Sequence, residues 1–161
     1  ERVKALYTFQ YKLHRELKRT CPKYLIDKAP KITHRVIDLE DKFTRSEIDS
    51  LTSLCVDLSK TKNVFVYIVT IDDYSPDTNI TDFANSYRDH WGQRGSYGKG
   101  NVMIAISATN RQIRVSTSDI STNFLSDEKC SEINKVIIPY LKEEKYFNGL
   151  ISGLNEIKKS L

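Results

Sequence analysis

Aspartates are the residues whose type and placement best suit chemistry in this chain. Asp72 and Asp73 follow the apolar run Asn63–Ile71, and α/β sheets place their ligands at the carboxyl ends of strands. Asp38 and Asp119 lie in other predicted loops that we expect to converge there. Because hard cations take several oxygen ligands at once, these four aspartates are a candidate site for Ca²⁺ or Mg²⁺. The alternative is that they are solvated loop acids.

Other kinds of active site find no support in the sequence. The glycine-rich segment Gly92–Asn101 leaves a predicted helix and enters a predicted strand, whereas a P-loop joins a strand to a helix and has Ser or Thr after its lysine. The three histidines show no HxxxH or HExxH spacing, and no serine lies in a GxSxG elbow. We therefore assign no catalytic residue.

Three cysteines lie far apart in the chain. Cys21, Cys55 and Cys130 show no paired spacing, which argues against a zinc site or a disulfide framework. Cys55 and Cys130 fall in step with apolar residues of predicted helices, so we expect both to be buried. Reduced thiols favour an intracellular compartment.

The positive charge is concentrated in an N-terminal arm. Residues 1–35 hold 10 Lys and Arg against 3 Asp and Glu, while the remaining 126 residues hold 15 against 18. The segment Glu1–Arg19 has the spacing of an amphipathic helix with an apolar stripe and a basic face. We predict that the arm lies in a partner's groove or on an anionic membrane surface, and the alternative is that it folds back on its own domain. The residues expected to bind are Lys4, Leu6, Phe9, Lys12, Leu13, Arg15, Leu17 and Lys18.

Two prolines, Pro22 and Pro30, mark an extended link after the arm. We therefore divide the chain into an arm and linker at residues 1–31 and a domain at residues 32–161. The domain is predicted to be an α/β fold, an α-β-α sandwich with a mostly four-stranded mixed sheet flanked by helices. Its predicted strands are 35–39, 63–71, 102–108 and 111–117, and its helices are 44–60, from residue 79 to the glycine-rich loop, 126–142 and 145–159. Thr109-Asn110 is predicted as a two-residue hairpin connection, and 118–123 as a loop.

The order of short motifs resembles the TPM domain family over about residues 32–161. The most specific match is Asp82-Phe83-Ala84-Asn85 through Trp91-Gly92, which is similar to the family's "DFANxxxxxWG". Further matches follow in the family's order, at Val36–Leu39, Arg111–Val115, Val136–Pro139, Tyr146 and Gly149-Leu150. The resemblance implies an α-β-α fold and an association with membrane complexes. Some relatives are credited with divalent metal binding and phosphatase activity.

The chain departs from the family at acidic positions. Lys99-Gly100-Asn101 stands where relatives carry acids before an Asn-Gly pair, and Lys145 and Phe147 replace further acids near the end. Asp38 and Asp72 are the matched or nearby acids that remain. Because the affinity of a site for a dication depends on its carboxylate count, these replacements imply that the chain binds a divalent cation weakly.

These observations favour a non-catalytic TPM-like accessory or assembly subunit of a larger, membrane-associated complex, with no cofactor. Its expected partners are other protein subunits. The alternative is a Ca²⁺- or Mg²⁺-dependent acid phosphatase, with Arg94 or Lys99 holding the phosphate. A third reading is an RNA-binding arm, but it predicts aromatics interleaved on the basic face, and Phe9 falls on the apolar stripe. No nucleic acid is expected as a partner.

The longest apolar runs, Val64–Val69 and Val102–Ile106, are far shorter than the roughly 20 residues that span a bilayer. A start at Glu1, a basic arm and unpaired cysteines are expected of an imported organellar protein. We therefore predict an organellar location peripheral to a membrane, with the mitochondrion favoured. The thylakoid lumen or another extracytoplasmic space is the alternative.

Overall fold

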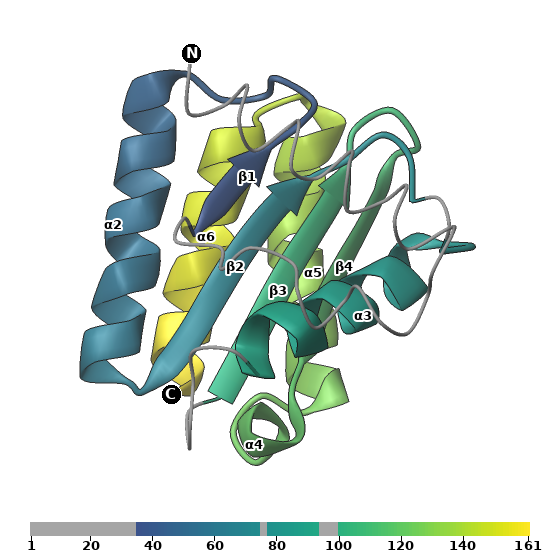
Figure 1. Cartoon of the computed structure of the whole chain (residues 1–161). Coiled ribbons are helices and arrows are strands. Elements are labelled where there is room, and N and C mark those ends of the chain that lie inside the picture. The colour runs from purple at the N-terminus through teal and green to yellow at the C-terminus, as the bar shows by residue number, and fades with distance from the viewer. Residues whose placement is uncertain (1–34, 75–76, 94–99) are drawn as a thin grey trace.

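The computed structural model describes residues 35–74, 77–93 and 100–161. The predicted helix of the arm and the division between residues 31 and 32 lie outside these residues and stay predictions. Strands and helices alternate from β1 to β3, a second strand follows β3, and three helices end the chain (Figure 1). They are β1 (Val36–Asp38), α2 (Arg45–Thr61), β2 (Val64–Thr70), α3 (Ile80–Gln93), β3 (Gly100–Ser107), β4 (Gln112–Thr117), α4 (Asp119–Thr122), α5 (Asp127–Lys142) and α6 (Tyr146–Ser160).

The four strands form one mixed sheet in the order β1-β2-β3-β4. The first three are parallel, and β4 runs antiparallel to β3. The carboxyl ends of β1 and β2 therefore lie side by side along one border of the sheet, where Asp38 pairs with Thr70. We call this border, formed by strand ends, the carboxyl edge. The carboxyl end of β4 lies at the opposite edge, where Thr117 pairs with Val102. This arrangement confirms the predicted four-stranded mixed sheet flanked by helices.

Two predicted connections differ from the structure. The hairpin between β3 and β4 has the four residues Ala108–Arg111 rather than two. Arg111 takes a left-handed backbone with φ 53°, and its N–H donates to the carbonyl of Ala108. Ala108 and Arg111 therefore belong to the turn and not to the two strands. The predicted loop at 118–123 contains the one-turn helix α4, because the Ser118 carbonyl accepts from the N–H groups of Ser121 and Thr122.

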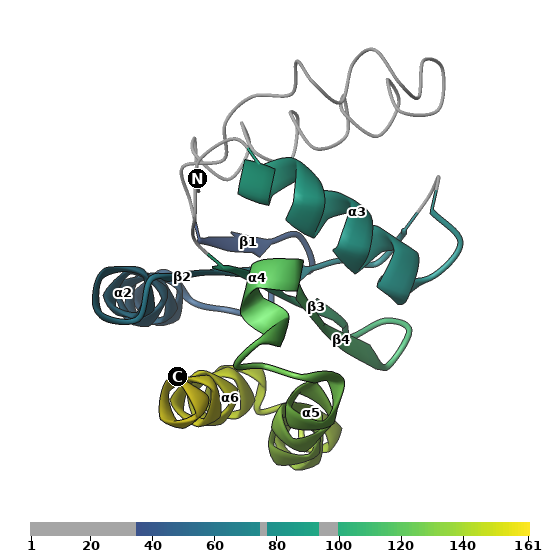
Figure 2. The same ribbon diagram turned by 90° about the horizontal axis from the view of Figure 1, so that it is seen from below.

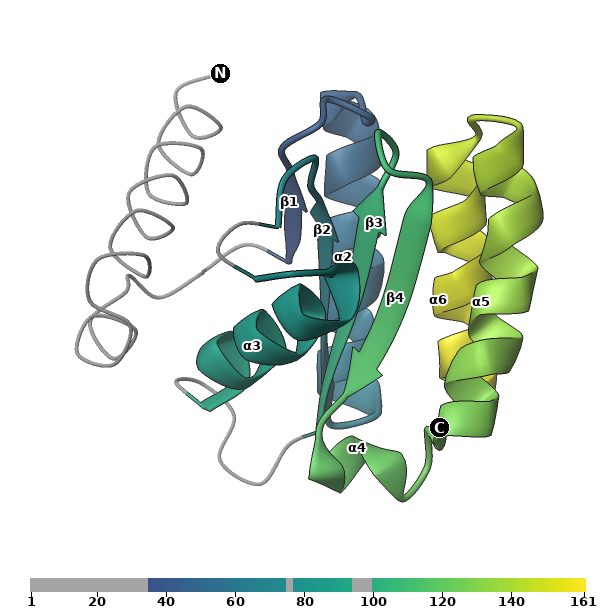
Figure 3. The ribbon, with the colours of Figure 1, turned by 90° about the vertical axis from the view of Figure 1, so that its right-hand side faces the viewer.

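The two faces of the sheet carry separate apolar clusters. On one face, side chains from all four strands pack with α2, α5 and α6. On the other, residues of β1, β2 and β3 pack with Ile80, Phe83, Ala84 and Tyr87 of α3. Figures 2 and 3 show α3 on the opposite side of the sheet from α5 and α6. The domain is therefore a three-layer sandwich.

Local signals in the sequence fix the helix ends. Thr44 and Glu47 form the predicted capping box of α2: the Thr44 hydroxyl accepts from the Glu47 N–H, and the Glu47 carboxylate accepts from the Thr44 N–H at 2.8 Å.

The last two helices, α5 and α6, approach one another closely. A Cβ on Gly153 would lie 2.5 Å from the Ile137 Cδ1, so a larger residue there would force the Ile137 side chain to shift.

Both cysteines that the structure describes are buried, as predicted. Burial raises the pKa of the Cys55 thiol to about 12. Desolvation also raises the pKa of Cys130. Both side chains are therefore neutral core residues at physiological pH.

The helices within residues 35–74, 77–93 and 100–161 include none with the length and apolar character of a membrane span.

Candidate functional site

Asp38 is the last residue of β1, and its carboxylate closes the turn into α2. One oxygen accepts from the N–H of Lys42 at 3.0 Å and the other from the N–H of Phe43 at 2.9 Å. The Thr70 hydroxyl of the neighbouring strand donates to the first oxygen. Asp38 is 7% exposed. Its oxygens therefore satisfy two main-chain donors and one side-chain donor at the carboxyl edge of β1 and β2.

Glu40 also accepts main-chain hydrogen bonds at the carboxyl edge. Its carboxylate accepts from the N–H groups of Ala108 and Thr109, at 2.8 and 2.9 Å, in the turn between β3 and β4. Its own N–H donates to the Thr70 hydroxyl oxygen at 3.1 Å. Glu40 thus connects the segment after β1 to the hairpin. Sequence reasoning did not identify it, because its partners lie 68 and 69 residues away.

Asp72 and Asp73 lie at the same edge, just after β2, and both are exposed. The hydrogen bond at Asp72 is made by its main-chain carbonyl, which accepts from the Asn110 side-chain amide at 2.9 Å. The same amide group donates to the Ser107 hydroxyl oxygen at 2.9 Å. The structure therefore brings Asp38, Asp72 and Asp73 to one edge, as the sequence predicts, but in different environments.

Asp119 lies at the opposite edge of the sheet. It is the first residue of α4, which follows the antiparallel strand β4. Figure 1 shows α4 at the bottom of the view and the arrowheads of β1 and β2 at the top. Asp119 therefore does not converge with Asp38. In the part of the chain that the structure describes, no three His, Cys, Asp or Glu side chains are grouped so that they could hold a metal ion.

A second polar cluster connects α3 to β4 near that opposite edge. The Arg88 guanidinium donates to the Ser116 hydroxyl at 2.8 Å and to the Thr117 carbonyl. The Ser116 hydroxyl in turn donates to the side-chain carbonyl of Asn85. Asn85 belongs to the "DFAN" motif, so one role of this motif is to attach α3 to the edge strand. The motif was visible in the sequence, but its partners on β4 were not.

The segment after β4 is held by serine hydroxyls. The Ser118 hydroxyl accepts from the Asn101 N–H at 2.9 Å, and the Ser121 hydroxyl donates to the Asn101 carbonyl at 3.0 Å. The two hydroxyls lie 3.1 Å apart. A Cβ on Gly100 would lie 2.4 Å from the Ser121 Oγ. The start of β3 and the segment that includes α4 are therefore fitted closely to one another.

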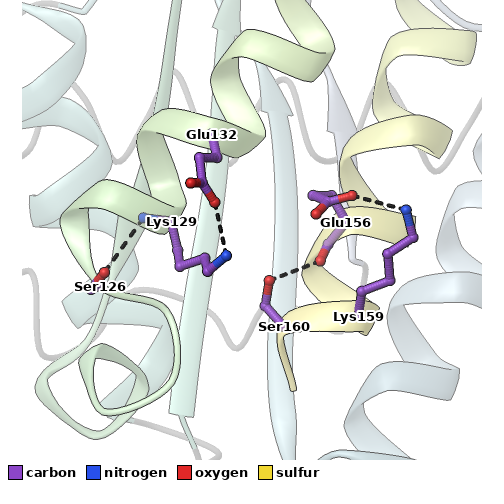
Figure 4. A network of polar contacts seen from close by, with 6 residues as sticks. All are labelled: Ser126, Lys129, Glu132, Glu156, Lys159 and Ser160. Carbon is purple, nitrogen blue, oxygen red and sulfur yellow. Dashed lines mark hydrogen bonds and ion pairs between the residues drawn. The ribbon is translucent and has the colours of Figure 1, made fainter.

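The outer surface of α5 and α6 carries ion pairs (Figure 4). Lys129 lies 2.8 Å from Glu132, and Lys159 lies 3.0 Å from Glu156. The hydrogen bond to Glu132 raises the pKa of Lys129, and the hydrogen bond from Lys129 lowers the pKa of Glu132. Exposed pairs of this kind add little to stability. They form a solvated surface rather than a site.

The predicted binding residues of the arm, Lys4 to Lys18, and the predicted phosphate ligands Arg94 and Lys99 lie outside the described residues. The side chains of His90 and Trp91 also lie outside them. What the described residues offer chemically is a set of carboxylates at the carboxyl edge. Asp38 and Glu40 there are bound to main-chain donors, and Asp72 and Asp73 are exposed to solvent.

Comparisons with solved structures show the same fold. The N-terminal domain of a protein from P. gingivalis, solved by NMR, matches with a TM-score of 0.69 at 18% identity, over 80% of this chain and 82% of that one. The BA42 protein of the psychrophilic bacterium Bizionia argentinensis matches with 0.66 at 14% identity, over 76% and 83%. The N-terminal domain of the cg2496 protein from Corynebacterium glutamicum matches with 0.60 at 13% identity, over 83% and 84%.

No curated protein matches the chain. A family model does match: the TPM domain model covers residues 36–160. The matched range takes in every described helix and strand, from β1 to α6. The resemblance carried by the short motifs is thereby confirmed, and the chain belongs to the TPM domain family.

Proposed function

We propose that this TPM domain is a non-catalytic accessory or assembly subunit of a larger protein complex. The observation that carries the proposal is the bonding of Asp38. This acid, matched to the family's opening motif, accepts hydrogen bonds from two main-chain N–H groups and one hydroxyl. Three of the roughly four lone-pair sites of the carboxylate are taken, so a cation bound to both oxygens would have to displace at least one donor, and an unsatisfied buried donor costs about 1–3 kcal/mol.

The position of Asp119 supports the same proposal. It lies at the opposite edge from Asp38 and Asp72, so a site at the carboxyl edge loses one of its four candidate ligands. Asp72 and Asp73 are exposed and adjacent in sequence. Two such carboxylates supply at most four of the six to eight oxygen ligands that Ca²⁺ takes, so carbonyl groups or water would have to supply the rest.

The arm supplies the proposed means of assembly. Its charge of 10 Lys and Arg against 3 Asp and Glu over residues 1–35 attracts acidic proteins and anionic membranes. We propose that its basic face, with Lys4, Lys12, Arg15 and Lys18, contacts another subunit of a complex peripheral to an organellar membrane. The mitochondrion is the favoured organelle.

A charge-matched pair of variants tests the role of the arm. The first carries Lys4→Gln, Lys12→Gln, Arg15→Gln and Lys18→Gln. The control carries Gln in place of four exposed lysines of the domain, Lys60, Lys135, Lys142 and Lys159. We expect the arm variant to lose co-migration with a larger complex on native gels of cell membranes, whereas the control keeps it. Equal behaviour of the two variants would contradict the proposal.

The alternative is a metal-dependent phosphatase at the carboxyl edge. The observation in its favour is the exposure of Asp72 and Asp73 at the edge where α/β sheets place ligands. This enzyme would use Asp38 as a further ligand, and Arg94 or Lys99 would hold the phosphate. It requires Ca²⁺ or Mg²⁺ to bind the native domain, which a rise in melting temperature would reveal.

A further inference from the structure

The strand β4 is the last strand of the described sheet, and Figure 2 shows it at the end of the sheet, between the layers of α3 and α5. The main-chain groups of an antiparallel strand point alternately to its two sides. Because the Ser118 N–H donates to the Asn101 carbonyl across the pair with β3, residues an even number of positions before Ser118 bond to β3. Ile113, Val115 and Thr117 therefore direct their N–H and C=O groups to the outer side of β4.

This outer side is occupied at one end and open at the other. The Arg88 guanidinium donates to the Thr117 carbonyl, and Val115 is 2% exposed. Next to the hairpin, Gln112 is exposed and Ile113 is partly exposed. The outward N–H and C=O groups of Ile113 meet no main-chain group of the described residues. A short stretch of β4 therefore remains open beside the hairpin.

Three side chains of β4 lie on the face that α3 covers. Arg114 pairs with Ala105, which packs with α3, and Gln112 and Ser116 lie two residues to either side on the same face. Both of these neighbours are bonded. The Gln112 side-chain carbonyl accepts from the Tyr74 hydroxyl at 3.0 Å, and Ser116 is bonded to α3. Arg114 lies between two satisfied side chains.

Arg114 itself has no such partner. Its Nε is buried and makes no hydrogen bond, and the ion pairs within the described residues do not include it. Buried polar groups in native proteins are nearly always bonded, and a charged donor without an acceptor costs more than a neutral one. The residue as a whole is partly exposed. Because no bond holds the side chain, rotation about its own torsions can bring the guanidinium to an acceptor on the outer side of β4.

We propose that Arg114 binds a carboxylate of a partner protein, carried on an extended segment that pairs with β4 beside Ile113. This surface rests on the proposed function, since it is where an assembly subunit would contact another subunit. The fork of a guanidinium matches the two oxygens of a carboxylate. On an added strand, the side chain opposite Arg114 lies on the same face, with its Cβ about 5 Å away. Main-chain pairing gives such a segment its affinity, and the ion pair gives it specificity.

Charge favours an acidic segment over a second copy of this chain. Residues 108–117, which form the turn and β4, contain Arg111 and Arg114 and no Asp or Glu. Pairing with β4 of a second copy would bring the same arginines close to these, and like charges across a strand pair are destabilising. A segment with Asp or Glu brings the complementary charge.

An NMR titration of the full chain with two synthetic peptides tests this inference. The probes are acetyl-Thr-Val-Glu-Val-Thr-amide and the same peptide with Gln in place of Glu. We expect the Glu peptide to shift the Arg114 Nε–H signal and the Ile113 amide signal saturably, with an affinity at least about tenfold above that of the Gln peptide. Equal affinities, no shift in β4, or a stronger response to inorganic phosphate than to the Glu peptide would overturn the inference.

Two variants that each remove one positive charge form a matched pair. Arg114→Gln should lower the affinity for the Glu peptide to that for the Gln peptide, whereas Arg111→Gln, at an exposed turn residue, should keep most of it. Arg114→Gln should also leave the melting temperature unchanged or raise it, because it removes a charge that the fold does not pair. Equal losses of binding in the two variants, or a clear fall in melting temperature for Arg114→Gln, would overturn the inference.

Photo-crosslinking in cells separates this inference from the proposed function. With p-benzoylphenylalanine in place of Gln112, we expect a crosslink to a subunit of the larger complex that is lost when Arg114→Gln is added. Co-migration with the complex and no crosslink, or a crosslink that is independent of Arg114, would overturn the inference and leave the proposed function standing. Absence of a larger complex would contradict the proposed function, and the peptide titration would still decide the role of Arg114.

Discussion

The two edges of the sheet hold polar side chains of opposite character. At the carboxyl edge of β1 and β2, Asp38 and Glu40 are acceptors for main-chain N–H groups. At the opposite edge Arg88 is a donor to Ser116 and to a main-chain carbonyl. In both places the charged group connects segments that are distant in the sequence. A charged residue at a strand end is thus evidence for a ligand site only when its side chain has donor or acceptor positions that neighbouring groups of the protein do not occupy.

The exposed pair Asp72 and Asp73 gives the contrast within one edge. Asp38 and Asp72 lie at the ends of neighbouring strands, yet Asp38 is 7% exposed and its carboxylate is bonded to main-chain donors, whereas Asp72 is exposed. The difference lies in the turns. The chain after Asp38 bends back, with Asp41 at φ 57°, so that the amides of Lys42 and Phe43 point at the Asp38 carboxylate. Substitutions can separate the structural acids from the exposed ones.

The largest effect is expected for Asp38→Ala. Removing this carboxylate leaves two main-chain N–H groups and the Thr70 hydroxyl without their acceptor, and we expect a loss of about 2–4 kcal/mol of unfolding free energy in urea. Asp38→Asn keeps one oxygen acceptor and should lose less. A loss below about 0.5 kcal/mol for Asp38→Ala, the range of an ordinary surface substitution, would show that Asp38 has no larger structural role than an exposed aspartate.

The next effect is expected at the opposite edge, for Arg88→Met. This change keeps much of the side chain's length and removes the donors to Ser116 and Thr117, so we expect a loss of about 1–3 kcal/mol in urea. Arg45→Met, at an exposed position in the first turn of α2, is the control and should change stability by less than about 0.5 kcal/mol. Equal effects of the two changes would show that the cluster contributes nothing.

Glu40→Ala should act more locally. It removes the acceptor of two N–H groups in the β3–β4 turn, where Thr109 is exposed and water can replace the carboxylate. We expect a loss of about 1 kcal/mol, with faster hydrogen exchange at Ala108 and Thr109. Unchanged exchange at both amides would argue against this connection.

The smallest effect is expected for Asp72→Ala. The hydrogen bond at this residue is made by its main-chain carbonyl, which the substitution keeps, and the side chain is exposed. Stability in urea should change by less than about 0.5 kcal/mol. A loss as large as that of Asp38→Ala would mean that the two acids do not differ in role.

The order of elements was predictable from local patterns. The capping box at Thr44 and Glu47 placed the start of α2, and the run of β-branched residues in Val64–Thr70 placed β2. The four-residue turn before β4 was missed, because a left-handed backbone at an arginine has no sequence signature. Short-range signals therefore gave the elements but not every connection.

The candidate site was predictable only in part. Parallel neighbours brought Asp38 and Asp72 to one edge, as strand order implies. The predicted hairpin already carried the information that Asp119 lies elsewhere, since a strand that reverses direction ends at the opposite edge. The donors to Asp38 and Glu40 depend on turn geometry and on contacts up to 69 residues apart, which one sequence does not reveal.

The most direct test of a non-catalytic role is a titration of the chain with Ca²⁺ and Mg²⁺, following the melting temperature together with hydrolysis of p-nitrophenyl phosphate. A ligand of the native state must raise the melting temperature. We predict no saturable rise and no hydrolysis with either ion. A saturable rise accompanied by hydrolysis, with both lost in Asp72→Ala, would contradict the account and establish the phosphatase alternative.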